Sequence, residues 1–403
     1  MEQKIDIFFS EKISLIILLL VSTLTIVLAS QIYTYEKALL LQDAVNYISL
    51  AENPRDYFTV PHQDALRILP SIIIYFLKFS GISTDNCFKF LTFILFIYLH
   101  LKTFFLLKSF RIKNYLALSA IAILFYSNHS VIYTVFNYYQ LLDLLTYILI
   151  IYFIQLNKIY DLKILFLVSL ISIFTKEYLL ILVCSTYLKY FINYKKRNTL
   201  LSLIFILIVF TFHYKFASSH NIESKENSNL IFLISSYFSS LNLFIKSIIE
   251  GLIIEKNILL FMPFSLLILS RSFIKILIKN YAIILFAIVP LAFSILLFQN
   301  VGNNFFRVFY HGYFIMLLLS ILFLNKIILN DSTSKMLFFI SPAFLIIDYI
   351  HILQSINQDG FFNFFQDTRY SYFSGYYMFN LIIIFIILKH FKDIFFKNLK
   401  INH

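Results

Sequence analysis

Apolar runs of about 14 to 22 residues alternate with short polar breaks along this chain. A hydrocarbon core of about 30 Å is crossed by about 20 helical residues. An α-helix satisfies its own backbone hydrogen bonds in lipid, and the alternating apolar and polar positions of transmembrane barrel strands are absent. The pattern therefore predicts an all-α, polytopic membrane protein with about twelve transmembrane helices.

The predicted spans form a single membrane domain over residues 1–403, with short connections at most places. The first span follows a charged tail and lacks a cleavage site, so it is interpreted as a retained anchor. The predicted spans cover residues 13–33, 87–107, 115–128, 139–156, 162–175, 177–191, 199–215, 257–271, 281–299, 313–329, 336–353 and 376–391.

Composition and charge placement support this arrangement. Hydrophobic residues make up 60% of the chain and charged residues 13%, against about 25% charged residues in soluble domains. The net charge is +12, and placing both termini in the cytoplasm puts 20 of the 33 Lys and Arg residues in cytoplasmic segments. This distribution follows the positive-inside rule. The basic excess is thus explained by topology, and no nucleic-acid partner is predicted.

Two apolar stretches do not fit as spans, because a crossing there would place later basic connections outside. Residues 65–81 contain Arg67, Pro70 and Lys78, and are predicted to form an amphipathic helix on the outer surface. Residues 229–254 lie in the longer outer loop 216–256 and are interpreted as an interfacial or re-entrant helix.

The first outer loop, residues 34–86, is the most informative segment. It is longer than most connections and is not of low complexity, which favours a functional role. Residues 35–51 have a helical pattern that places Asp43 and Tyr47 on one face. A solvated amphipathic helix with scattered charges is the alternative interpretation of the same pattern.

This segment resembles part of a known family. The sequence DAVNYISLA (Asp43 to Ala51), then RILP (Arg67 to Pro70), then SGIS before the second span resembles the GT-C glycosyltransferases. It is most similar to the bacterial multi-span members related to protein mannosyltransferases. Asp143 near an outer span end and the Lys176–Glu177 pair at a tight turn are weaker matches. The resemblance covers residues 10–180 and, beyond them, the number of helices.

The resemblance implies transfer of a sugar from a polyprenyl-phosphate carrier to a glycan, lipid or protein acceptor, at the outer face of a bacterial cytoplasmic membrane. It makes Asp43 the candidate general base. Arg67 and Arg307 are candidates for the phosphate, because a guanidinium offers paired donors to phosphate oxygens. The other candidates for the substrate pocket are Tyr47, His62, Asp143, Lys176, Glu177 and His311.

Several alternatives stay open. Arg307 in an outer loop could instead extend to lipid headgroups. Many GT-C enzymes have two adjacent acids in the first outer loop, whereas Asp43 is followed by Ala44, so a Mg or Mn site is not assigned. Competing functions are a polymerase or ligase of lipid-linked oligosaccharides, a transporter or flippase, and an inactive relative. Against transport, the chain has only six Gly and six Pro and no internal repeat.

Overall fold

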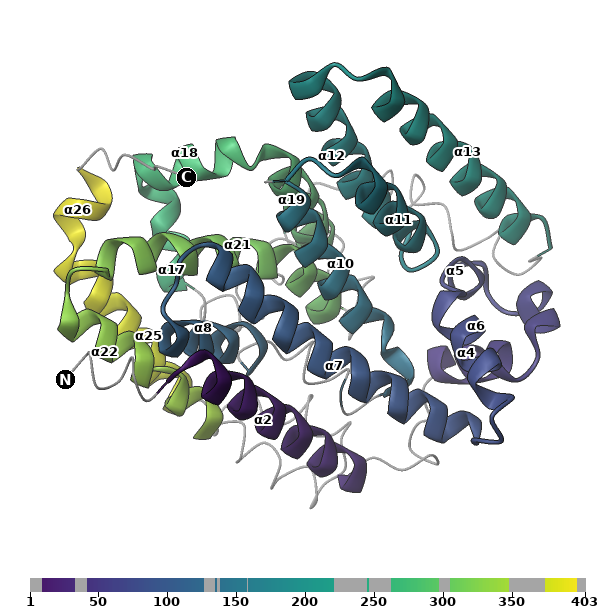
Figure 1. The fold of residues 1–403 in the computed structure, drawn as a ribbon, viewed down its shortest axis with the longest axis horizontal. Coiled ribbons are helices and arrows are strands. Elements are labelled where there is room, and N and C mark those ends of the chain that lie inside the picture. The colour runs from purple at the N-terminus through teal and green to yellow at the C-terminus, as the bar shows by residue number, and fades with distance from the viewer. Residues whose placement is uncertain are drawn as a thin grey trace.

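The computed structural model describes residues 9–32, 42–126, 135, 138–157, 159–220, 245, 262–296, 305–347 and 374–396 (Figure 1). Every regular element within these ranges is helical, which confirms the all-α fold class. The N-terminal helix α2 (Glu11–Ile32) packs against α7 (Thr84–Ser109) and α8 (Asn114–Tyr126). The long α7 also packs along α10 (Leu142–Leu156), so it is the helix that the other helices of the N-terminal half contact.

The other half of the bundle is built around one close helix pair. These two helices, α19 (Tyr281–Leu296) and α21 (Phe305–Ile328), pack against each other, and α12 (Leu179–Tyr194) covers α19. The remaining helices of this part are α11 (Leu162–Ile173), α13 (Arg197–His220), α17 (Met262–Leu266), η5 (Leu267–Leu269), α18 (Arg271–Lys279), α22 (Ser332–Ile340), α25 (Ser374–Lys389) and α26 (Phe391–Phe395).

The described part of the first predicted outer loop folds against the end of this bundle. Its apolar side chains form a cluster separate from the main core, with Tyr47, Leu50 and Leu66 packed against Tyr138 and Tyr139. The elements are α4 (Gln42–Glu52), η1 (Pro54–Phe58), α5 (His62–Leu66) and α6 (Leu69–Lys78), and η2 (Tyr138–Gln140) adjoins them.

Three helical segments in the described ranges are long and apolar enough to cross a membrane: Thr84–Ser109, Arg197–Ser218 and Tyr310–Ile328. A fourth span results if the bent pair Arg271–Lys279 and Tyr281–Leu291 is counted as one. Several other apolar helices have 10–17 residues. The structure thus supports association with a membrane, whereas the number of twelve spans and the orientation stay predictions.

Three predicted boundaries are wrong. The stretch 65–81 is not one helix but the end of α5 and the whole of α6, because Pro70 lacks the N–H that a helix running through Arg67 would need. The predicted span 257–271 is not one continuous helix, since from Met262 on it consists of α17 and the 3-10 turn η5, which ends at Leu269. Helix α21 begins at Phe305, eight residues before the predicted span, so Arg307 and His311 lie on a helix and not in a loop.

Other parts of the prediction fall beyond the described residues. The proposed helix 229–254 lies outside them except for Ile245, and the loop 216–256 begins in the last turn of α13. The two cysteines, Cys87 and Cys184, are both free thiols.

Helices α19 and α21 approach each other closely at Gly312. A Cβ atom at this position would overlap the carbonyl oxygen of Ala287 and press on the side chain of Leu291. The glycine is therefore required by the packing of two backbones rather than by its own conformation. It lies next to His311, so the same contact sets the position of that ring.

The substitution Gly312→Ala should destabilise the protein by about 1–3 kcal/mol, because the backbone of α19 has to move to admit a methyl group. Thermal unfolding of the purified protein in detergent measures the loss. A matched control is Gly81→Asn, since Gly81 has a φ of +82° and open space around it, and Asn tolerates that conformation. Equal shifts of Tm for both variants would contradict the packing argument.

Candidate functional site

The site is built around the turn between α11 and α12. The carbonyl oxygen of Phe174, in this turn, accepts a hydrogen bond from the backbone N–H of Leu69 (3.3 Å). From α13, Nε2 of His213 donates to the carbonyl oxygen of Leu66 (3.1 Å). These two bonds fasten the break between α5 and α6 to the bundle on both sides. Arg67 lies within that break and is thereby held above the turn.

Arg67 and Glu177 form a two-point ion pair across 110 residues of sequence. Nε of Arg67 donates to Oε2 of Glu177 (3.1 Å), and Nη2 donates to Oε1 (2.5 Å). Such paired geometry fixes the plane of the guanidinium as well as its position. Nη1 has no hydrogen-bond partner among the described residues. The pair is partly accessible, with 19% of the Arg67 side chain and 33% of the Glu177 side chain exposed.

Each partner stabilises the charge of the other. Burial alone would lower the pKa of Arg67, but the carboxylate of Glu177, with smaller effects from Tyr47 and Asp64, holds it well above its usual value. Burial alone would raise the pKa of Glu177, but the charge and hydrogen bonds of Arg67 lower it below its usual value. Both groups are therefore ionised at neutral pH.

A second, deeper ion pair lies directly beside the first. The ammonium of Lys176 pairs with Oδ1 of Asp143, and both side chains are almost completely buried. Nε2 of His311 lies 3.5 Å from the same carboxylate oxygen, and Nδ1 of His311 lies 2.8 Å from the hydroxyl of Tyr178. The ring of Tyr147 packs on the imidazole, with centroids 4.9 Å apart. Helices α10 and α21 and the turn before α12 are thus joined through polar groups inside an apolar bundle.

The sequence-predicted residues of the outer loop surround this centre. Tyr47 is buried in α4, and its carbonyl oxygen accepts a hydrogen bond from Ser71 (3.1 Å). His62 is buried with its ring edge on Tyr214, and its Nε2 has no hydrogen-bond partner among the described residues. Asp64, two residues on, accepts from Nδ2 of Asn46 (2.6 Å).

Two predicted residues are described only by their backbones. Asp43 lies in the first turn of α4, four residues before Tyr47, and Arg307 lies in the first turn of α21, four residues before His311. Their side chains lie outside the described part of the structure. The other seven predicted residues are described, and the structure gathers Arg67, Asp143, Lys176, Glu177 and His311 at one end of the bundle, with the short outer-loop helices that hold Tyr47 and His62 docked there.

Sequence reasoning missed Tyr178 and gave Asp64 and His213 no role in holding the site. Tyr178 directly follows the Lys176–Glu177 pair, so its place in the same turn was a usable signal. The contact of His213 with the outer loop joins residues 147 positions apart and has no local signal.

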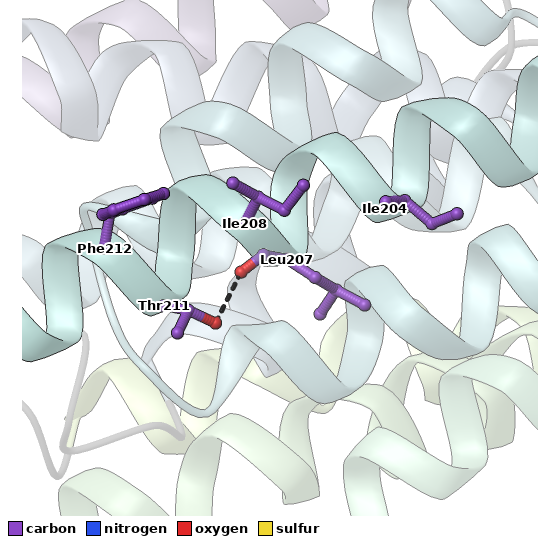
Figure 2. Close-up of a pocket in the computed structure, with 5 residues that line it drawn as sticks. All are labelled: Ile204, Leu207, Ile208, Thr211 and Phe212. Atoms are coloured by element: carbon purple, nitrogen blue, oxygen red, sulfur yellow. Dashed lines mark hydrogen bonds between the residues drawn. The ribbon is translucent and has the colours of Figure 1, made fainter.

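An apolar surface leads along α13 toward this site. Ile204, Leu207, Ile208, Thr211 and Phe212 line one hollow on the helix, where the Thr211 hydroxyl is turned back onto the carbonyl oxygen of Leu207 (Figure 2). The apolar surface continues into a second hollow of about 610 Å³, which also involves Phe212 and is lined by Phe174, Val209, His213, Lys215 and Phe216. It ends where His213 meets the backbone beside Arg67.

Metal ligands do not gather at this site within the described part of the chain. No three His, Cys, Asp or Glu side chains of the described residues converge closely enough to hold an ion. The carboxylates of Asp143 and Glu177 are instead paired with cations of the protein itself.

No protein-family model, no curated protein and no solved structure matches this chain. The fold and site therefore define its class by themselves. It is an all-α protein with several helices fit to cross a membrane, and paired charges are gathered at one end of its helical bundle.

Removing one charge of the buried Lys176–Asp143 pair should lower the stability of the protein more than removing both charges together. Asp143→Asn or Lys176→Met alone should destabilise by about 3–5 kcal/mol, because each leaves one buried charge without its partner. The double variant should lose less than either single variant. Thermal unfolding in detergent provides the four measurements of this cycle. The control is Lys89→Met at the more exposed Lys89–Asp85 pair (2.7 Å), where 34% of the Lys89 side chain is exposed and the loss should be about 0–1 kcal/mol. Additive losses at Asp143 and Lys176 would contradict a buried pair.

The Arg67–Glu177 pair predicts a defined acid sensitivity. The pKa of Glu177 is lowered on folding, so its stabilisation is complete above its unfolded pKa of about 4.3 and is lost as pH falls through the lower folded value. Between pH 7 and pH 3, Tm of the wild type should therefore fall more steeply than Tm of Glu177→Gln. Identical pH slopes for the two proteins would show that the pair contributes no such linkage.

Proposed function

We propose that this protein is an integral membrane glycosyltransferase that uses a polyprenyl-phosphate-linked sugar at the outer face of a bacterial cytoplasmic membrane. The observation that carries the proposal is the fixed guanidinium of Arg67, whose Nη1 has no hydrogen-bond partner among the described residues while Glu177 holds the other edge. A prearranged cation at the end of an apolar bundle suits a phosphate that lies at the surface of the lipid.

The chemistry requires three functions from the chain. The acceptor hydroxyl attacks the anomeric carbon as its proton passes to a carboxylate, for which Asp43 is the proposed base. The bond between that carbon and the phosphate oxygen breaks, and the carrier phosphate leaves with the electron pair. Arg67 stabilises the negative charge that develops on this phosphate.

The two hollows along α13 support a lipid-linked donor over a water-soluble one. They are lined mainly by Ile, Leu, Val and Phe side chains, and they run toward the backbone contact beside Arg67. A hydrocarbon chain in this surface would be withdrawn from the bilayer at little cost, while its phosphate reaches the polar end. Lys215, at the end of the second hollow, would be a second cation for that phosphate.

The buried Lys176–Asp143 pair has a supporting role in this proposal. Because Lys176 is already paired, it does not bind the phosphate but fixes the turn that places Glu177. His311 and Tyr178 complete the same polar cluster from the neighbouring helices. We further propose that twelve spans surround this centre and that both termini lie in the cytoplasm.

The test compares Asp43→Asn and Arg67→Ala with Arg55→Ala, a substitution in the same loop at an exposed residue whose side chain makes no ion pair with any described residue. The purified protein in lipid nanodiscs is given a radiolabelled polyprenyl-phosphate sugar and an extract of cell-envelope acceptors. We expect Asp43→Asn and Arg67→Ala to lower transfer at least a hundredfold, because each removes a group that acts in the transition state, and Arg55→Ala to transfer normally.

Two results would overturn the proposal. The first is unchanged transfer or unchanged surface glycan in Asp43→Asn and Arg67→Ala cells that hold normal amounts of the protein. The second concerns topology, measured with Thr59→Cys in a protein whose Cys87 and Cys184 are replaced by Ala. If Thr59→Cys reacts with an impermeant maleimide only after the cells are permeabilised, the loop is cytoplasmic.

A further inference from the structure

Helix α18 (Arg271–Lys279) leaves the direction of the bundle. Its axis makes an angle of 99° with the segment Tyr281–Leu291 of α19, across a break of one residue. Its first turn is fixed by Ser270, whose Oγ accepts from the backbone N–H of Phe273 (3.3 Å) and donates to the carbonyl oxygen of Ile394 in α26 (2.5 Å). If α19 crosses a membrane, α18 therefore runs nearly parallel to the membrane plane.

The helix has three distinct faces. Ser272 and Phe273 are buried against the bundle, where the Phe273 ring packs on Phe323 with centroids 5.3 Å apart. A second face carries exposed cations four residues apart, which therefore form one row along the helix: Arg271, Lys275 and Lys279.

Beside the cationic row, exposed apolar side chains form an edge that continues into η5. Ile278 is 66% exposed and Leu269 is 72% exposed, with Ile268 and Ile274 less so. Exposed aliphatic side chains next to a row of cations are typical of a helix that lies in the membrane interface. A water-soluble acidic partner would leave this apolar edge in water.

The charges of the row are not compensated by the described residues. The helix contains no acid, and Arg271, Lys275 and Lys279 make no ion pair or hydrogen bond through their side chains to any described residue. Cations spaced four residues apart on a helix repel one another. From the neighbouring elements, Lys189 of α12 lies over the Tyr281 ring at the bend (5.9 Å), which adds positive charge to this side.

Asp393 of α26, the acid next to Ile394 in the sequence, does not neutralise the cationic row of α18. It pairs with His390 (3.9 Å) and directly follows Lys392. The row therefore requires negative charge from outside the described structure, and the adjacent apolar edge requires a hydrocarbon phase.

We propose that α18 lies flat in the membrane interface and binds the headgroups of anionic phospholipids through Arg271, Lys275 and Lys279. Ile274, Ile278 and Leu269 enter the outer part of the acyl region beneath those headgroups. The binding site is independent of the proposed transferase site, since its three cations all lie on α18, which contributes no residue to that site. It would orient the α18–α19 bend against one leaflet of the membrane.

The test uses an environment-sensitive fluorophore at Leu269→Cys, in a full-length protein whose Cys87 and Cys184 are replaced by Ala. The protein is placed in nanodiscs of phosphatidylcholine and phosphatidylglycerol, and only one of the two lipids is brominated in each sample. We expect brominated phosphatidylglycerol to quench at least threefold more than brominated phosphatidylcholine at equal mole fraction. The excess should decline as salt is added, because the contact is electrostatic.

The variant Arg271→Gln, Lys275→Gln, Lys279→Gln should quench equally with both lipids. Its matched control is Lys195→Gln, Lys196→Gln, Arg197→Gln, which removes the same charge from an exposed connection and should keep the preference. The proposal is overturned if the parent protein shows no preference, if the α18 variant retains it, or if the control loses it too. A fluorophore that neither brominated lipid quenches would show that the edge lies outside the bilayer. The salt dependence is measured on the labelled parent protein and needs neither charge variant, so it decides the matter even if one of them fails to fold.

Discussion

The buried ion pair between Lys176 and Asp143 is the interaction on which the polar end of the structure depends. Two charges withdrawn from water are tolerated only when each satisfies the other, and both side chains here are almost completely buried in the helical bundle. The pair fixes the turn after α11 in position and direction. This turn carries the Phe174 carbonyl oxygen and the Glu177 carboxylate, which both accept hydrogen bonds from the outer loop. A displaced turn would release both contacts at once.

The apolar side chains of the loop share one cluster with Phe88 of α7 and with Tyr138 and Tyr139 of η2, so the loop is attached to the bundle by a common apolar core. Tyr47, Leu50 and Leu66 pack with Tyr138 and Tyr139, whose hydroxyls both donate to Asp85 at the start of α7 (2.5 and 2.6 Å). In addition to this apolar packing, the loop is held by two hydrogen bonds to backbone carbonyls and by the Arg67–Glu177 ion pair. These polar contacts fix the direction of the loop and occupy only one edge of the Arg67 guanidinium among the described residues.

The sequence was sufficient for some of these features and not for others. Apolar periodicity predicted most helices, and the resemblance to GT-C glycosyltransferases placed Arg67, Asp143 and Glu177 among the candidates for one pocket; the structure brings these three residues to one region. It could not predict which cation pairs with which acid, because the choice depends on contacts between residues far apart in sequence. The predicted start of helix α21 was too late in the sequence, because the polar stretch before Phe305 resembles a loop. The bend at Asn280 could not be predicted either, because charged residues before a span are equally typical of a simple connection.

The long sequence separation within the Arg67–Glu177 pair has a consequence during synthesis of the protein. Arg67 is synthesised 110 residues before its partner. At about 5–20 residues per second, this leaves the guanidinium without Glu177 for on the order of ten seconds during translation. Asp143 precedes Lys176 by only 33 residues, so both ion pairs become available at nearly the same moment, when the turn between α11 and α12 emerges. The apolar contacts of the loop with α7 and η2 can therefore form before its ion pair, which is completed only when Lys176 and Glu177 have been synthesised.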